Sequence, residues 1–222
     1  MSEQRFNKLI SVLSQRQPDL TVLIEAVDKP HNLAAIARTC DAVGISHIHA
    51  VSATRSLRLS QMAAGGIRKW VGLSKHKTTA DAFDQLKAEN MQLIVTHLSD
   101  DTKDFREIDY TRPSAIIAGS EVEGVSDYAI EHADHCISIP MLGMAQSLNV
   151  SVAISIILYE AMQQRQLAGM YQQQRLDPQS YQNKLFEGLH PKVSQYCKQH
   201  KLPYPELDRH GNISTELFNL KK

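Results

Sequence analysis

The chain has 222 residues, of which 42% are hydrophobic and 22% charged, and its 24 basic residues balance 24 acidic ones. This length predicts one main domain of about 150 residues with additions, and the composition excludes an intrinsically disordered chain. No apolar run reaches the roughly 20 residues of a membrane-spanning helix, and the first ten residues lack the apolar core of a signal peptide. The three cysteines show no CxxC pairing, which favours reduced thiols. We therefore expect a cytoplasmic protein that has no membrane partner.

Hydrophobic patterns predict strands and helices that alternate along the chain. A helix at 5–15 precedes a β-branched strand at 21–27 and a helix at 32–44 that ends on Gly44. Further strands are predicted at 47–51, 92–98, 114–119 and 136–139, and further helices at 80–87, after Ser126 and from Ser147. This order predicts an α/β fold, a mostly parallel sheet with helices on both faces, whose ligands bind at the carboxyl ends of the strands.

The sequence changes character from about residue 169. Residues 171–174 are rich in Gln. The segments LDPQSYQNKLFEGL and PKVSQYCKQH that follow predict two short helices, and KLPYPEL predicts an extended, proline-containing tail. We therefore expect three parts: an N-terminal helical extension at 1–18, the sheet domain at 19–168 and a C-terminal helical extension at 169–222.

Charge is spread unevenly along the chain although it cancels overall. Residues 42–80 contain no Asp or Glu but six cations, Arg55, Arg58, Arg68, Lys69, Lys75 and Lys77. Residues 113–164 contain acids but no Lys or Arg. The basic stretch is either a solvated surface or a strip that binds nucleic-acid phosphates.

Polar residues gather in three segments near predicted strand ends. In the first, Asn32 and Arg38 lie six residues apart, and Arg38, among small apolar residues, either reaches solvent or has a functional partner. In the second, 119–126, two glycines flank Glu121, so that backbone amides can approach a ligand. In the third, 140–149, polar residues serve either as helix caps or as part of a site.

Several familiar sites are excluded by the residues present. The glycine-bearing segment lacks the Lys and Ser or Thr of a Walker loop, and no GxGxxG dinucleotide motif occurs. His47 and His49 share a strand face without a carboxylate or thiol nearby in sequence, so we expect no metal. No GxSxG elbow marks a serine nucleophile. A cofactor must therefore bind in another way.

Taken together, the three segments resemble the signature motifs of the SpoU/TrmH group of RNA ribose methyltransferases, within the SPOUT class. The matching residues are Asn32 to Arg38, Gly119-x-Glu121-x-x-Gly124, and Ile139-Pro140-Met141-x-Gly143 followed by Ser147-Leu148-Asn149. They occur in the order and spacing of the family. The segments RQPDLTV, KPHN, THLSD, FREIDYTRP, LAGMY and LPYP are similar to those of the bacterial tRNA-modifying members. Two departures, Ala34 for a common Gly and Val125 for Leu or Ile, leave the polar motif residues intact.

The resemblance implies an enzyme that uses S-adenosylmethionine, bound in a C-terminal deep trefoil knot, and that works as a homodimer whose sites draw on both subunits. The implied catalytic residues are Arg38, Asn32, Glu121, Ser147 and Asn149. The implied cofactor contacts are Thr96, Leu98, Gly119, Ile139, Met141, Ser147 and Leu148. Because arginine stays charged, Arg38 is expected to stabilise alkoxide charge or to hold an RNA phosphate that takes the proton.

The implied reaction is methylation of the ribose 2'-hydroxyl of a conserved D-loop guanosine, position 18, in tRNA. The motifs alone leave open an rRNA or another tRNA ribose as substrate, and also a non-catalytic RNA-binding protein of the same fold. Contacts to tRNA phosphates are expected from basic residues. These are Arg5, Lys8, Arg16, Arg55, Arg58, Lys75, Lys77, Arg165 and Arg175.

Overall fold

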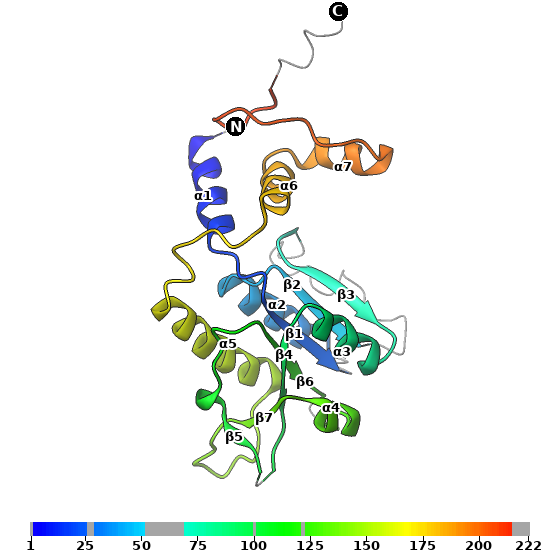
Figure 1. Ribbon diagram of the computed structural model, residues 1–222, viewed down its shortest axis with the longest axis vertical. Coiled ribbons are helices and arrows are strands. Elements are labelled where there is room, and N and C mark those ends of the chain that lie inside the picture. The colour runs from blue at the N-terminus through cyan, green and yellow to red at the C-terminus, as the bar shows by residue number, and fades with distance from the viewer. Residues whose placement is uncertain (1, 26–28, 52–68, 100, 121–122, 215–222) are drawn as a thin grey trace, which may run out of the picture. The chain divides into compact units, whose positions relative to one another are not determined.

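The computed structural model describes residues 2–25, 29–51, 69–99, 101–120 and 123–214 (Figure 1). The chain divides into two compact units. The sheet unit spans Gln17–Met170, and the helical unit combines Met1–Arg16 with Tyr171–Lys222. The two terminal extensions therefore belong to one compact unit.

Among the described residues, seven parallel strands form the sheet, in the order β3-β2-β1-β6-β4-β7-β5. Their bounds are β1 Leu20–Glu25, β2 His47–Val51, β3 Gly72–His76, β4 Gln92–Thr96, β5 Lys103–Asp104, β6 Ser114–Ala118 and β7 His135–Ser138. The predicted α/β fold with a parallel sheet is confirmed. The sequence does not predict β3, because GLSKH is an edge strand with little apolar character, or β5, which has only two residues.

Helices cover both faces of the sheet. α2 (Pro30–Ala42) and α5 (Val150–Leu167) pack on one face, and α3 (Thr79–Ala88) and α4 (Asp127–His132) on the other (Figure 1). Along β1, Val22 and Ile24 enter the first core and Leu23 enters the second, as alternation in a strand requires. With both faces covered, every residue of β1 is buried. No helix among the described residues is both long and apolar enough to cross a membrane.

Side-chain caps determine where two of these helices begin. Thr78 and Asp81 exchange side-chain and backbone hydrogen bonds in a capping box ahead of α3. α5 begins at Val150, three residues after the predicted start at Ser147, because the cap is Asn149, whose Oδ1 accepts the Ser151 N–H at 2.8 Å. The polar segment before Asn149 therefore remains a loop.

The helical unit consists of α1 (Glu3–Ser14), α6 (Pro178–Leu189) and α7 (Pro191–His200). Leu9 and Leu13 of α1 are buried, and Arg5 donates a hydrogen bond to the carbonyl of Gly188 in α6 at 2.8 Å. Gly211 adopts φ of +76°, and a Cβ added there would lie 2.6 Å from the ring of Phe6. Contacts between the two ends of the chain thus hold this unit together.

Burial contradicts the RNA-binding role predicted for Arg165. Its side chain is fully buried in the sheet unit, and all five of its N–H donors are used. Nε donates to the Tyr110 carbonyl at 2.8 Å, and Nη1 donates to Asp19 Oδ1 at 2.7 Å and to Gln17 at 3.2 Å. Nη2 donates to the carbonyls of Asp19 and Arg112, each at 3.1 Å. Arg165 therefore ties the end of α5 to the segment that leads into β1.

Three histidines lie together on β2 and β3, and two of them are hydrogen-bonded to each other. His49 Nδ1 and His76 Nε2 share a buried hydrogen bond of 2.9 Å, and His47 Nε2 lies 2.8 Å from Ser74 Oγ. Burial, reinforced by charge on His47 and His76, lowers the pKa of His49 from 6.5 to about 4. Burial also lowers the pKa of His76. The fold therefore favours the neutral form of both rings.

His49 makes stability depend on pH. Between its pKa of about 4 in the folded chain and its ordinary 6.5, the unfolded chain binds a proton that the folded chain does not. This contribution to stability is complete above pH 6.5 and is lost as the pH falls toward 4. We predict that His49 contributes the uptake of about one proton on unfolding near pH 5.5, to which His76 adds; the slope of the unfolding free energy against pH in urea titrations measures their sum.

His49→Gln should reduce that slope, because the substituted side chain does not titrate. The matched control is His132→Gln, which removes an exposed histidine of α4 and should leave the slope unchanged. An undiminished slope in His49→Gln would assign the pH dependence to other groups.

Candidate active site

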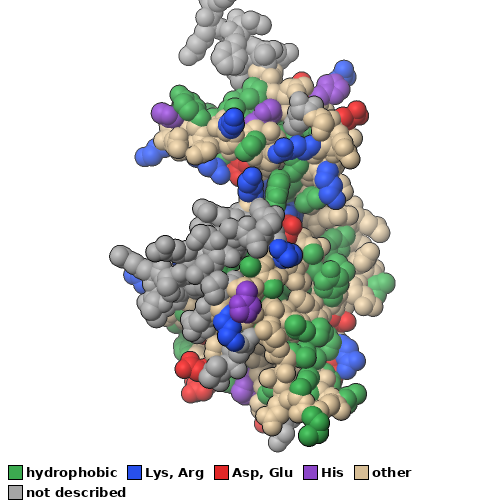
Figure 2. All heavy atoms as spheres, turned by 180° about the vertical axis from the view of Figure 1, so that it is seen from behind, with side chains coloured by type: hydrophobic (Ala, Val, Ile, Leu, Met, Phe, Trp, Pro, Cys, Tyr) green, Lys and Arg blue, Asp and Glu red, His purple; other side chains and the backbone are tan. Residues whose placement is uncertain are grey.

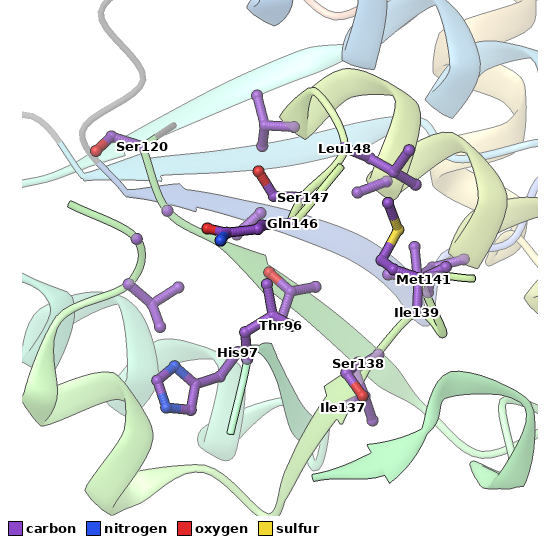
Figure 3. A pocket seen from close by; sticks show the side chains of 18 of the residues that line it. Thr96, His97, Ser120, Ile137, Ser138, Ile139, Met141, Gln146, Ser147 and Leu148 are labelled. Carbon is purple, nitrogen blue, oxygen red and sulfur yellow. The ribbon is translucent and has the colours of Figure 1, made fainter. Parts of the chain in front are cut away.

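A cavity of about 390 Å³ opens at the carboxyl ends of β4, β6 and β7. Small-molecule sites measure about 300–1,000 Å³. Its walls are residues 96–98, the loop after β6, residues 137–141, residues 146–148 and the first turns of α5 (Figure 3). The cavity thus lies at the edge where a parallel sheet binds its ligands.

The cavity has an apolar side and a polar side (Figure 3). The apolar side includes Ile139, Met141 and Leu148, and the polar side includes Ser120, Gln146 and Ser147. No Lys or Arg occurs among the described residues that line the cavity, whereas Glu123 contributes a carboxylate. Such a wall disfavours a phosphate and suits an uncharged or positively charged ligand.

The loop after β6 folds back on itself as a tight turn. Ser120 N–H donates to the Gly124 carbonyl at 3.0 Å, and Gly124 N–H donates to the Ser120 carbonyl at 3.1 Å. Gly124 adopts φ of +71°, a conformation that favours glycine. Gly119 has no room for a side chain, because an added Cβ would lie 1.7 Å from the Gly124 carbonyl oxygen. Glu121 belongs to this loop in sequence and lies outside the described residues.

A pair of asparagines joins α2 to α5. Asn149 Nδ2 donates to Asn32 Oδ1 at 3.3 Å, and Asn32 exposes only 2% of its surface. Further along the same two helices, the hydroxyls of Thr39 and Ser155 share a hydrogen bond of 2.9 Å. Because Ser147 lines the cavity two residues before Asn149, the asparagine bond connects the first and third polar segments beside the cavity.

The structure brings most of the predicted site residues together. All the predicted cofactor contacts line the cavity, namely Thr96, Leu98, Gly119, Ile139, Met141, Ser147 and Leu148. Arg38 is different: it lies exposed on α2 and is not part of the described cavity wall. Its side chain makes no ion pair or hydrogen bond within the part of the chain that the structure describes. The roles of these residues remain predictions.

The predicted RNA-binding residues differ in exposure. Arg5, Lys8, Lys75 and Lys77 are exposed, and Arg175 is half-buried. Arg16 exposes only 1% of its surface, so its burial, like that of Arg165, contradicts a phosphate contact. Arg55 and Arg58 lie outside the described residues.

Metal ligands and activated thiols do not mark this site. No group of three His, Cys, Asp or Glu side chains placed to hold a metal occurs in the described ranges. Burial raises the pKa of the Cys40 and Cys136 thiols, which makes both poorer nucleophiles.

Five polar residues of the described cavity wall are not among the predicted site residues. They are His97, Ser120, Glu123, Ser138 and Gln146. Each is the immediate neighbour of a predicted site residue or of a motif residue, so the available signal is the position at a strand end or in the loop that follows it. Residue type alone does not single them out.

Comparison with known proteins decides the family. The model described as the SpoU rRNA methylase family matches residues 19–159, and the model for SpoU rRNA methylase C-terminal regions matches residues 163–216. The chain belongs to the SpoU methylase family. This confirms the resemblance drawn from the three motif segments, all of which fall within the first match.

Individual relatives of this SpoU family chain are named for tRNA and rRNA methylation. It is 47% identical over 218 residues to the tRNA (guanosine(18)-2'-O)-methyltransferase of Escherichia coli (strain K12), covering 97% of this chain and 95% of that relative. The A. aeolicus TrmH/SpoU tRNA modifying enzyme matches with a TM-score of 0.75 and 37% identity, over 91% of this chain and 98% of that one. An AdoMet-bound rRNA methyltransferase from Sinorhizobium meliloti matches with a TM-score of 0.60 and 31% identity, over 70% and 59% of the two chains.

Gly119→Ala should disrupt the loop after β6, because the added methyl group overlaps backbone atoms that have no flexible end to move. We predict a loss of about 2 kcal/mol in the free energy of unfolding, measured by urea titration. Gly143→Ala is the matched control, since a Cβ there meets nothing within 4 Å. Equal stability of the two variants would contradict the tight turn.

Proposed function

We propose that this protein transfers the methyl group of S-adenosylmethionine to the ribose 2'-hydroxyl of guanosine 18 in the D-loop of tRNA, in the cytoplasm. The observation that carries this proposal is the cavity at the carboxyl edge of the sheet, whose wall holds the predicted cofactor contacts. The tRNA substrate is supported by 47% identity, over nearly the whole chain, to an enzyme named for that reaction.

The cavity suits S-adenosylmethionine. Its apolar side matches the adenosine, and a described wall without Lys or Arg suits the positive charge of a sulfonium. When bound, this cofactor supplies an electrophilic methyl group. The residues that would hold it are Thr96, Leu98, Gly119, Ile139, Met141, Ser147 and Leu148. A structural relative, the Sinorhizobium meliloti enzyme, was solved with AdoMet bound.

The side chains must orient the ribose oxygen and ease the loss of its proton. Arg38 remains charged at neutral pH, and it has no carboxylate partner among the described residues. Its guanidinium is therefore available to stabilise negative charge on the ribose oxygen, or to hold an RNA phosphate that takes the proton. The bond between Asn32 and Asn149 orients α2, which carries Arg38, against the segment that carries Ser147. Glu121 completes the motif residues proposed for the site.

A homodimer is part of this proposal, with active sites that draw on both copies. α5 exposes an apolar stripe, Val152, Ile156 and Tyr159, with exposures of 46%, 36% and 50%. These positions recur at helical spacing on one side of the helix, and an exposed apolar stripe indicates a protein contact. α5 packs against α2, the helix that carries Arg38, so a second copy on this stripe lies near the exposed arginine.

The knot is proposed for the C-terminal half of the sheet unit. Segments that follow β6 and β7 both line the same cavity, and β4, to which both strands pair, lies between them. The meeting of these two segments at one cavity supports the deep trefoil knot that the family resemblance implies.

The charge distribution supports an RNA partner. The helical unit contains 11 Lys and Arg residues against six Asp and Glu, whereas the sheet unit contains 13 against 18. The zero net charge of the chain therefore conceals a cationic unit, and Figure 2 shows Lys and Arg side chains over the face of that unit. The proposed contacts to tRNA phosphates are Arg5, Lys8, Lys75, Lys77 and Arg175, together with Arg55 and Arg58.

The other substrates and functions have less support. An rRNA ribose matches the name of the family model, but not that of the relative that covers 97% of this chain. A non-catalytic RNA-binding protein is disfavoured because the chain retains Asn32, Arg38, Glu121 and Asn149.

Arg38→Ala should lower kcat for tRNA methylation at least about 100-fold, because a group that stabilises developing charge is removed. The dissociation constant for S-adenosylmethionine should stay within about twofold, since Arg38 is not part of the described cavity wall. Radiolabelled methyl transfer and calorimetric titration measure the two quantities.

The matched control is Arg106→Ala, which removes another exposed arginine and should leave both quantities unchanged. A tRNA whose guanosine 18 lacks the 2'-hydroxyl should accept no methyl group from the wild-type enzyme. Methylation of that tRNA, or of rRNA in preference to tRNA, would overturn the proposed substrate.

Replacing Val152 and Tyr159 together by Glu should convert the protein from a dimer to a monomer, because two charges would be buried without partners. Sedimentation should then show the chain mass of 24.9 kDa in place of twice that value. Tyr196→Glu, which changes an exposed tyrosine of α7, should leave the mass unchanged. A wild-type monomer would contradict the proposed homodimer.

A further inference from the structure

Glu25 is a buried carboxylate at the carboxyl end of β1, and the mechanism proposed for methyl transfer gives it no role. It exposes 5% of its surface. A carboxylate removed from water costs free energy unless hydrogen bonds replace its hydration. Three donors supply them, from two helix starts that are far apart in sequence: one from Thr79 and two from Ser126.

The hydrogen bonds of Glu25 reach backbone as well as side chains. Its Oε2 accepts the Ser126 N–H at 2.9 Å, and its Oε1 accepts the hydroxyls of Ser126, at 2.9 Å, and of Thr79. Ser126 is also the N-cap of α4, where its Oγ accepts the Ala129 N–H at 3.2 Å. Thr79 is the first residue of α3. Both oxygens of Glu25 thus have partners, one on the backbone and two on side chains.

Ser126 ends the loop that forms part of the cavity wall. That loop leaves β6 at Gly119, where backbone crowding leaves no room for any other residue. It turns back through the Ser120 and Gly124 hydrogen bonds, and then passes through the buried Val125. One end of the loop is therefore held by the sheet and the other by Glu25. Glu25 itself is not part of the described cavity wall.

An amide at position 25 could not replace the carboxylate. Glutamine presents one oxygen and one NH₂ group, so it cannot accept from all three donors, and its NH₂ would face the Ser126 N–H or the two hydroxyls. The N–H of Ser126 has no rotational freedom with which to adapt, whereas a hydroxyl does. In Glu25→Gln the amide oxygen therefore faces the Ser126 N–H and the NH₂ donates to the hydroxyls, so that this N–H keeps only a neutral amide acceptor, which is weaker than a carboxylate.

We propose that Glu25 is a positioning residue: by holding Ser126 it keeps the adjoining cavity-wall residues Glu123 to Val125 in the positions that bind the cofactor. The identity of that cofactor rests on the proposed function. The role of Glu25 does not require direct contact with the cofactor or with RNA, and it predicts a selective effect on the cofactor side of the reaction.

The first test is Glu25→Gln in the full chain, with kinetics for each substrate. We expect KM for S-adenosylmethionine to rise about tenfold while KM for tRNA stays within about twofold. Ser126→Ala, which keeps the backbone N–H but removes the hydroxyl, should give a smaller rise in the same direction. A Glu25→Gln enzyme with wild-type KM values and kcat would overturn the proposal.

The second test needs no cofactor. Amide hydrogen exchange in the peptide that spans 119–126 should become about tenfold faster in Glu25→Gln, because the anchored end of the loop opens more often. Unchanged exchange there would also overturn the proposal. If the wild-type protein binds no S-adenosylmethionine, the proposed function fails, and this measurement still decides the role of Glu25.

Asp19→Asn is the matched control. Asp19 precedes β1 at its opposite end and pairs with the buried Arg165 at 2.7 Å, so this variant reduces stability through a carboxylate remote from the cavity. We expect a lower melting temperature, with KM for S-adenosylmethionine and exchange at 119–126 both unchanged. A rise in that KM equal to the rise in Glu25→Gln would mean that general destabilisation explains both.

Discussion

The parallel pairing of the described strands is the constraint on which the rest of this structure depends. Parallel strands need crossover connections, and the helices in those connections bury both faces of the sheet. Every strand then ends on the same edge, so loops that are distant in sequence meet there. The cavity, the tight turn at Gly119 and the carboxylate of Glu25 all lie at this edge. Strand direction thus determines which loops meet at the cavity, and the residues of those loops determine its chemistry.

Strands and the cavity wall could be predicted from sequence because their signals are local. The β-branched and apolar runs mark β1, β4 and β6. The family resemblance of the motifs assigns Gly119 and Ser147 to the cofactor site, and both line the cavity. Burial of charge has no such local signal. Arg165 looks like a surface cation until Asp19 and three backbone carbonyls, all distant in sequence, are seen around it. Glu25 stays unnoticed for the same reason, since its partners come from two later helices.

Charge is partitioned between the two units of the chain. The sheet unit has more acids than bases, and the described wall of its cavity contains no cation. The helical unit has the opposite excess. A positively charged cofactor and a polyanionic substrate make opposite electrostatic demands. The described cavity wall, without Lys or Arg, suits the cofactor, and the proposed RNA contacts among the described residues lie outside that wall, in the helical unit and, at Lys75 and Lys77, on the surface of the sheet unit. Salt should therefore weaken the association with RNA much more than the affinity for the cofactor.

α5 is secured at both extremities. Its 18 residues extend about 27 Å at the ordinary helical rise, from the Asn149 bond to Asn32 beside the cavity to the Arg165 bonds at the far end of β1. Because hydrogen bonds hold both ends of α5, the helix resists tilting and sliding. A changed contact on the exposed side of α5 therefore alters the packing of its first turns, which line the cavity, and does not move the whole helix. Natural variation along that side is thus expected to alter turnover even where it touches neither cofactor nor RNA.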